Sequence, residues 1–104
     1  MIKVMIGFNK RPNVDIQSTL QKLKSYAMTF RGFSGIESLE SEEGGSIVVL
    51  VFNWERLDDW NTWKASHARK QLLDETQALL FYEPKVTAYK VVPMSGWSSK
   101  GSIP

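Results

Sequence analysis

Three side chains that can bind or react with a small molecule lie close together in the second half of the chain. Trp60, Trp63 and His67 are three and four residues apart, and His67 is the only histidine. Residues at this spacing share one face of an α-helix. Two indoles and an imidazole on one face would line an apolar ligand pocket that holds a single polar group.

The same three residues also admit a structural interpretation. Aromatic stripes at helical spacing usually belong to a hydrophobic core. A histidine beside a helix break can hydrogen-bond the carbonyl groups at the end of the helix. For an isolated amphipathic helix this packing interpretation is favoured, so the pocket needs further support.

Several other chemistries are excluded. The chain has no cysteine, and His67 has no carboxylate partners at metal-ligand spacing, so we predict no metal site. Ser66 and His67 are adjacent and diverge by about 100° on a helix, so they cannot form a nucleophile–base pair. Gly44-Gly45 is an isolated turn signal rather than a phosphate-binding loop.

Asn9 is a further candidate on the predicted sheet. It ends the first strand on the face opposite Ile6 and Phe8. An amide there could reach a ligand. The alternative, a turn-forming asparagine before Lys10-Arg11-Pro12, is at least as well supported.

Size and charge restrict the class of protein. The 104 residues suffice for one domain, and thirteen basic against eleven acidic residues leave a net charge of +2. The basic residues are scattered, so no nucleic-acid partner is expected. No apolar segment has membrane-spanning length, and the N-terminal alternation is too short for a signal peptide. We therefore expect a cytoplasmic protein without a membrane partner.

The first half of the chain predicts a strand, a helix and a second strand. Residues 2–9 alternate between apolar and other side chains, which is typical of a strand with one buried face. Asn13 is expected to cap a helix over residues 16–30, where apolar residues recur every three or four positions. Residues 33–42 form a weaker strand with a bulge near Gly35.

The second half predicts a hairpin, a broken helical region and a last strand. A glycine pair forms the hairpin turn over residues 43–46. The strand over residues 47–52 is apolar at every position, so both of its faces require cover. A helical region over residues 57–80 is expected to break near Ser66 or His67, and the last strand spans residues 85–92.

The resulting order, β-α-β-β-α-β, is that of an α+β, ferredoxin-like fold. Its antiparallel sheet carries both helices on one face, which leaves the other face of strand 47–52 without cover. A two-fold homodimer that stacks sheet on sheet would supply that cover. We predict one domain over residues 1–92, a flexible tail over residues 93–104 that contains Trp97, and a pocket between the sheet and the helices of each subunit.

Two segments carry a resemblance to a known family. Phe52-Asn53-Trp54-Glu55 places an aromatic–acidic pair at the end of a strand, and the helix from Asp59 to His67 has a tryptophan followed one turn later by histidine. Over residues 1–92 the chain resembles the antibiotic biosynthesis monooxygenase family of dimeric α+β barrel proteins. The resemblance implies a homodimeric, cofactor-independent oxygenase that acts on electron-rich aromatic substrates such as quinols or anthrones.

The resemblance also implies roles for the candidate residues. A deprotonated, electron-rich substrate can itself reduce dioxygen, so no metal or other cofactor is expected. The protein would supply a dry apolar pocket, a base, and a donor to the developing anion. On this basis His67 is the expected base, Asn9 the expected donor to a substrate oxygen, and Trp60 and Trp63 the substrate-binding walls.

Two other functions stay open at this point. Haem-degrading relatives are similar over the strand and the tryptophan-bearing helix. Their axial histidine lies about where Leu73 stands here, so the resemblance makes haem binding less favoured. The other possibility is a non-catalytic dimeric module that binds a small apolar ligand or acts in a stress response.

Overall fold

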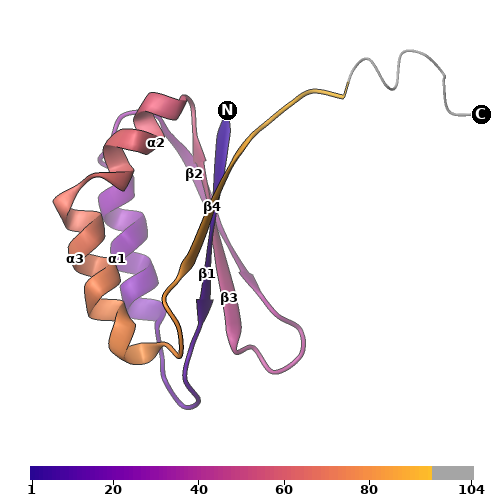
Figure 1. Ribbon diagram of the computed structural model, residues 1–104, viewed down its shortest axis with the longest axis vertical. Helices are drawn as coiled ribbons and strands as arrows, with labels where there is room; N and C mark the ends of the chain where they lie inside the picture. The colour runs from indigo at the N-terminus through magenta and orange to yellow at the C-terminus, as the bar shows by residue number, and fades with distance from the viewer. Residues whose placement is uncertain (95–104) are drawn as a thin grey trace, which may run out of the picture.

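The chain alternates strands and helices in the predicted order (Figure 1). The structure, a computed structural model, describes residues 1–94. Its elements are β1 (Ile2–Asn9), α1 (Gln17–Ala27), β2 (Phe33–Glu40), β3 (Ile47–Trp54), α2 (Leu57–Lys64), α3 (His67–Thr76), the short 3-10 helix η1 (Gln77–Leu79) and β4 (Lys85–Lys90).

The four strands form one antiparallel sheet in the order β2-β3-β1-β4. Helices α1, α2 and α3 all lie on the same side of this sheet, as Figure 1 shows. The predicted α+β, ferredoxin-like fold with helices on one face is therefore confirmed.

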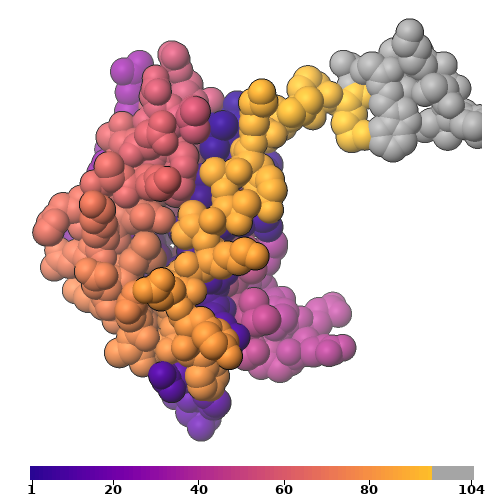
Figure 2. Space-filling view, in the orientation of Figure 1, coloured from indigo at the N-terminus to yellow at the C-terminus, as the bar shows by residue number. Residues whose placement is uncertain are grey.

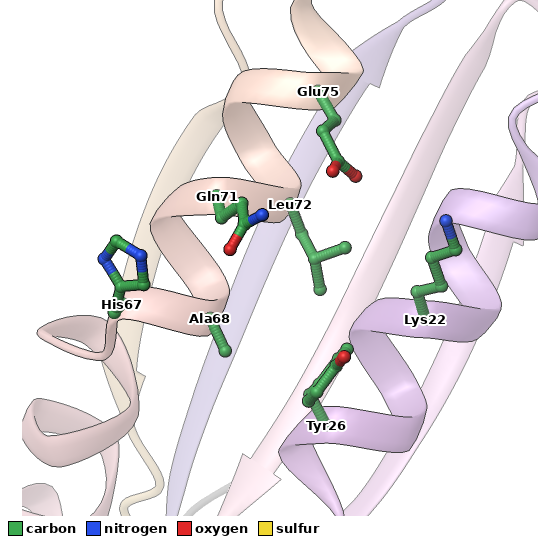
Figure 3. A pocket seen from close by; sticks show the side chains of 7 residues that line it. All are labelled: Lys22, Tyr26, His67, Ala68, Gln71, Leu72 and Glu75. Carbon is green, nitrogen blue, oxygen red and sulfur yellow. The ribbon is translucent and has the colours of Figure 1, made fainter.

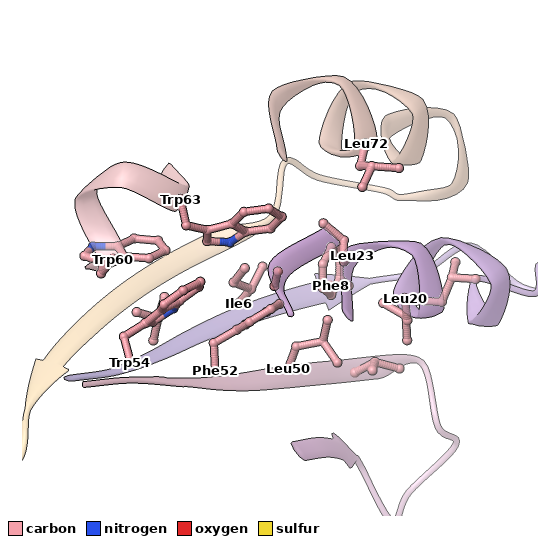
Figure 4. Packing of buried hydrophobic residues seen from close by; sticks show 14 of the residues in the cluster. Ile6, Phe8, Leu20, Leu23, Leu50, Phe52, Trp54, Trp60, Trp63 and Leu72 are labelled. Atoms are coloured by element: carbon pink, nitrogen blue, oxygen red, sulfur yellow. The ribbon is translucent and has the colours of Figure 1, made fainter. Parts of the chain in front are cut away.

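Strand alternation decides which side chains the helices cover. In β1, the side chains of Val4, Ile6 and Phe8 are at most 1% exposed. They stand opposite Phe52, Leu50 and Val48 of β3, so the two central strands present one continuous apolar surface to the helices. Leu20 and Leu23 of α1 and Leu72 of α3 close the core from above (Figure 4). Burial of this surface is the main stabilising contribution to the fold.

The other face of the sheet, here named the open face, has no helix over it. Its central side chains come from alternate positions of β1 and β3, including Met5, Val49 and Val51. Leu39 of β2 and Tyr89 of β4 flank them and are 46% and 52% exposed. Val49 is only partly buried. Residues 1–94 therefore do not supply the second covering layer that the apolar strand suggested.

The β-bulge and the turn of the hairpin between β2 and β3 follow the sequence prediction. The register of β2 against β3 shifts between Phe33 and Gly35. Gly44 and Gly45 both adopt positive φ in the turn, a conformation that costs little without a Cβ atom. The strands are paired along their whole length on either side of these two features.

The start of α1 differs from the prediction. Asn13 does not cap the helix, because it adopts a left-handed conformation with φ of 60° within the preceding turn. The helix begins four residues later, and the Asp15 carboxylate accepts a hydrogen bond from the backbone N–H of Gln17 at 2.9 Å. Asparagine tolerates positive φ better than most residues, and at this position the turn uses that property.

The second helical region breaks where the sequence predicted it. Lys64 ends α2 and His67 begins α3. Ser66 has extended backbone dihedral angles, and its Oγ accepts a hydrogen bond from the backbone N–H of Arg69 at 3.2 Å. Serine is a favoured N-cap because it satisfies one donor at the start of a helix.

The last strand ends two residues earlier than predicted. After Lys90, the backbone N–H of Val91 still donates to the carbonyl of Met1 at 3.1 Å. The predicted boundary between domain and tail at residue 92 stays a prediction, and Trp97 lies outside the described residues. Within residues 1–94, no helix is long and apolar enough to cross a membrane.

Candidate functional site

The two tryptophans of α2 lie in the core, beneath the helices. Trp63 is fully buried, and its ring packs edge-on against Phe30 with centroids 5.0 Å apart. The same ring lies 6.4 Å from Phe52 and 6.2 Å from Trp54, both on β3. Trp60, one turn earlier, is 3% exposed. Figure 4 shows the indoles of Trp54, Trp60 and Trp63 in the space between α2 and the sheet.

This aromatic layer contains two indole donors without an acceptor. The Nε1 atoms of Trp54 and Trp63 are buried and have no hydrogen-bond partner among residues 1–94. A buried unsatisfied N–H costs free energy, because it has lost its bonds to water. These two donors are the polar feature of an otherwise apolar region, and an acceptor atom placed between the helices and the sheet would satisfy them.

The break at Ser66 separates His67 from the tryptophans. The prediction that Trp60, Trp63 and His67 share one helical face holds only for the two tryptophans, which both belong to α2. His67 is the first residue of α3, whose axis follows a new direction after Ser66, and its side chain is exposed. The spacing rule fails here because it applies within one continuous helix.

His67 instead lines a groove between α1 and α3, on the outer side of the helix layer (Figure 3). The groove has a volume of about 360 Å³. Lys22 and Tyr26 enter it from α1, and Gln71 and Glu75 from α3, as Figure 3 shows. Its apolar floor is formed by Ala68 and Leu72.

Asn9 lies on the other side of the molecule. It pairs with Ile47 at the end of the β1–β3 ladder, and its position in the alternation puts it on the open face. Its backbone carbonyl accepts a hydrogen bond from Phe81 N at 2.9 Å. The roles expected of Asn9, Trp63 and His67 imply one shared pocket, which is not formed within one subunit because the sheet stands between Asn9 and the other two residues. The roles predicted for the individual residues stay predictions.

Arg69 is a feature that the sequence prediction missed. Its side chain is 8% exposed although it is charged, and its guanidinium carbon lies 5.4 Å from the centre of the Trp60 ring. Desolvation by burial lowers the pKa of this guanidinium from its ordinary value. A signal existed in the sequence, since Arg69, Leu72 and Thr76 recur at three and four residues and all prove buried.

The side chains of residues 1–94 give no support to a metal or haem site. Among residues 1–94 there is no group of three or more His, Asp and Glu side chains placed to hold a metal ion. Leu73, the position at which the resemblance places the axial histidine of haem-degrading relatives, is an apolar residue packed against the core.

Comparisons with known proteins establish the fold. No protein-family model matches the chain, and no curated protein matches it either. Among solved structures, SnoaB from Streptomyces nogalater, a cofactor-independent oxygenase, has a TM-score of 0.78 at 12% identity, over 89% of this chain and 94% of SnoaB. A proposed antibiotic biosynthesis monooxygenase from Nitrosomonas europaea has a TM-score of 0.78 at 12% identity, over 89% of this chain and 100% of its own.

A third structure, Rv0793 from Mycobacterium tuberculosis, gives a TM-score of 0.78 at 17% identity, over 90% of this chain and 97% of its own. The chain therefore shares its α+β fold with these three structures over nearly their whole length, and one of them is named as an antibiotic biosynthesis monooxygenase. At identities of 12 to 17% the likeness is one of fold, and function has to be argued from the side chains.

Proposed function

We propose that this protein is a cofactor-independent monooxygenase that oxidises an electron-rich aromatic small molecule, such as a quinol or an anthrone. The observation that carries the proposal is the groove between α1 and α3, which the only histidine of the chain lines together with a lysine and a tyrosine. The fold shared with SnoaB supports the same reaction class.

The reaction needs a base and a place for negative charge. For an anthrone, the CH₂ carbon and O₂ become a carbonyl group and water, so one oxygen atom enters the product and the other leaves as water. His67 accepts the first proton, and the resulting anion passes an electron to O₂ before the carbon–oxygen bond forms. His67 returns its proton to the peroxide that this bond creates. Removal of the second proton from that carbon then forms the carbonyl group and breaks the O–O bond, and the hydroxide released takes up that proton to become water. A positioned base contributes about 10²- to 10⁴-fold to such a proton transfer.

Within the groove, Lys22 and Tyr26 are the donors available to the substrate oxygen as negative charge develops on it. They take the role expected of Asn9, which the sheet separates from this groove. The aromatic ring of the substrate lies on the floor made by Ala68 and Leu72. In this proposal Trp60 and Trp63 do not contact the substrate. They anchor α2 in the core and thereby position the start of α3.

We also propose that the protein acts as a homodimer through the open face, in the cytoplasm. The open face combines the apolar residues Met5, Val49 and Val51 with Glu37 of β2 at one edge and Lys85 of β4 at the other. Two such faces related by a two-fold axis parallel to the strands would bring the edge with Glu37 over the partner's edge with the opposite charge, two residues apart along the strands. The groove of His67 lies on the far side of each subunit and stays accessible in this dimer.

Oxygen uptake tests the activity directly. Purified protein is assayed in an oxygen electrode with a panel of anthrones and quinols, with His67→Ala as the test variant and Asn61→Ala, an exposed change on α2, as the control. We expect substrate-dependent uptake that falls by about 10²-fold or more in His67→Ala and is unchanged in Asn61→Ala. Equal uptake by wild type and His67→Ala would exclude the proposed base.

A non-catalytic binding module is the second candidate, favoured by the packed aromatic layer around Trp63. A core that is already closed supplies no dry reaction chamber. Quenching of tryptophan fluorescence by the same aromatic compounds, without oxygen consumption, would support this module in place of the oxygenase.

A further inference from the structure

Arg69 is a buried cation with few partners. Within the described part of the chain its side chain forms one hydrogen bond, in which Nη1 donates to the carbonyl of Lys64 at the end of α2. This bond is long, at 3.4 Å. Its Nε is buried and has no partner among residues 1–94. The face of Trp60 supplies the other contact, a cation–π interaction.

A buried guanidinium normally has a carboxylate or several carbonyl groups around it, because removing its charge from water is costly. Here one carbonyl and one aromatic ring take that place. The guanidinium group therefore has N–H donors for which the described residues provide no acceptor. Its planar geometry matches that of a carboxylate.

Arg69 lines a groove between α3 and the start of β4, with a volume of about 380 Å³. Leu73, Pro84 and Val86 give this groove an apolar lining beside the cation. Val86 belongs to the side of β4 that faces the helices, yet it is 36% exposed, so the helix layer does not extend over this edge of the sheet. Figure 2 shows the surface hollowed between the helices and β4.

The charges around the groove favour a particular class of anion. Lys70 adds a second positive charge to that of Arg69, while Asp74 and Glu83 add two negative ones. The negative pair repels a phosphate or a dicarboxylate more strongly than a single carboxylate. An apolar body with one carboxylate therefore suits the groove better than a polyanion.

We propose that the groove between α3 and β4 is a binding site for a monocarboxylate with an aromatic or similarly apolar body, and that Arg69 binds the carboxylate. This site is distinct from the groove of the proposed oxygenase. His67 and Arg69 are two residues apart on α3, so their side chains project to opposite sides of the helix. The site goes beyond the proposed function and does not require it.

Binding is measured with 2-naphthoate as the probe and 2-naphthalenemethanol as the neutral analogue, without oxygen or turnover. Nuclear magnetic resonance of the ¹⁵N-labelled protein follows the Nε–Hε signal of Arg69 and the backbone amides of α3 and β4. The variants are Arg69→Gln and Arg69→Met, which remove the charge, and Lys70→Gln, which removes an equal charge from an exposed position in the same groove.

We expect saturable shifts at Arg69, Leu73 and Val86 with naphthoate, and much weaker binding of the neutral analogue. Either Arg69 variant should lose about tenfold or more in naphthoate affinity, and Lys70→Gln clearly less. Equal affinity of wild type and both Arg69 variants, shifts confined to the groove of His67, or no binding at millimolar naphthoate would each overturn the proposal. If neither variant folds, the map of shifts on the wild type decides it alone.

Discussion

Gly32 and Asp59 lie so close together that residue 32 has no room for a side chain. A Cβ atom at Gly32 would stand directly against the carboxylate and the Cβ of Asp59. The carbonyl of Gly32 also accepts a hydrogen bond from Glu55 N at 2.8 Å, which ties the turn after α1 to the end of β3. This contact fixes α2 over the sheet, because Asp59 lies in the first turn of that helix.

The first prediction concerns this contact. Gly32→Ala should lower the free energy of unfolding by about 2 to 4 kcal/mol, because strain at positive φ adds to overpacking against Asp59. Gly44→Ala is a matched control, since Gly44 has nearly the same φ but no atom near its missing Cβ. Urea unfolding of both variants measures the difference, and equal losses would show that Asp59 moves aside without cost.

The second prediction concerns the cap of α3. Ser66→Ala should cost about 1 kcal/mol, because the backbone N–H of Arg69 loses its acceptor. Thr62→Ala serves as the control, since the Thr62 hydroxyl bonds back to the carbonyl of Asp58 within α2 and alanine is a better helix former. Thermal unfolding compares the two, and a larger loss for Thr62→Ala would contradict the assigned cap.

The third prediction separates the ring of Trp63 from its N–H group. Trp63→Ala should cost about 3 to 5 kcal/mol, because it leaves a cavity among Phe30, Phe52 and Trp54. Trp63→Phe should cost much less, because it retains an aromatic ring and breaks no hydrogen bond of the described structure. Denaturant unfolding tests this order. A phenylalanine variant as unstable as the alanine variant would show that the N–H has a partner after all.

The fourth prediction concerns the proposed homodimer. Val49→Lys places a charge at the centre of the open face and should shift the protein from dimer to monomer in sedimentation velocity. Leu57→Lys is the control, because Leu57 is apolar and 55% exposed but lies on α2, away from the open face. A wild-type protein that sediments as a folded monomer at micromolar concentration would refute the dimer.

The fold followed from the sequence because its signals are local and periodic. The alternation of Ile2, Val4, Ile6 and Phe8 needs no knowledge of the rest of the chain to indicate a buried strand face. Ser66 marked the helix break for the same reason, since a serine cap acts through its own neighbours.

The arrangement of the candidate site was harder to predict because it depends on the relative orientation of separate helices and strands. Two residues of linker after α2 rotate His67 away from the tryptophans, and no spacing rule extends through such a break. Asn13 satisfied the rule for a helix cap, yet the turn used its tolerance of positive φ instead. Arg69 escaped notice because a charged residue is expected at the surface, although its helical spacing with Leu72 and Thr76 pointed to the buried face. Its contacts with Trp60 and Lys64 became visible only in the structure.

The short linker at Ala65 and Ser66 also gives this domain a simple way to change its chemistry. Because the linker is not helical, adding or removing one residue there would change how α3 begins and which of its sides faces the sheet, while α2 keeps its place. His67 and Arg69 would then meet new surroundings, while the buried indoles of Trp60 and Trp63 would stay where they are. Two grooves of different charge could thus be reshaped by a single small insertion, without any substitution in the interior.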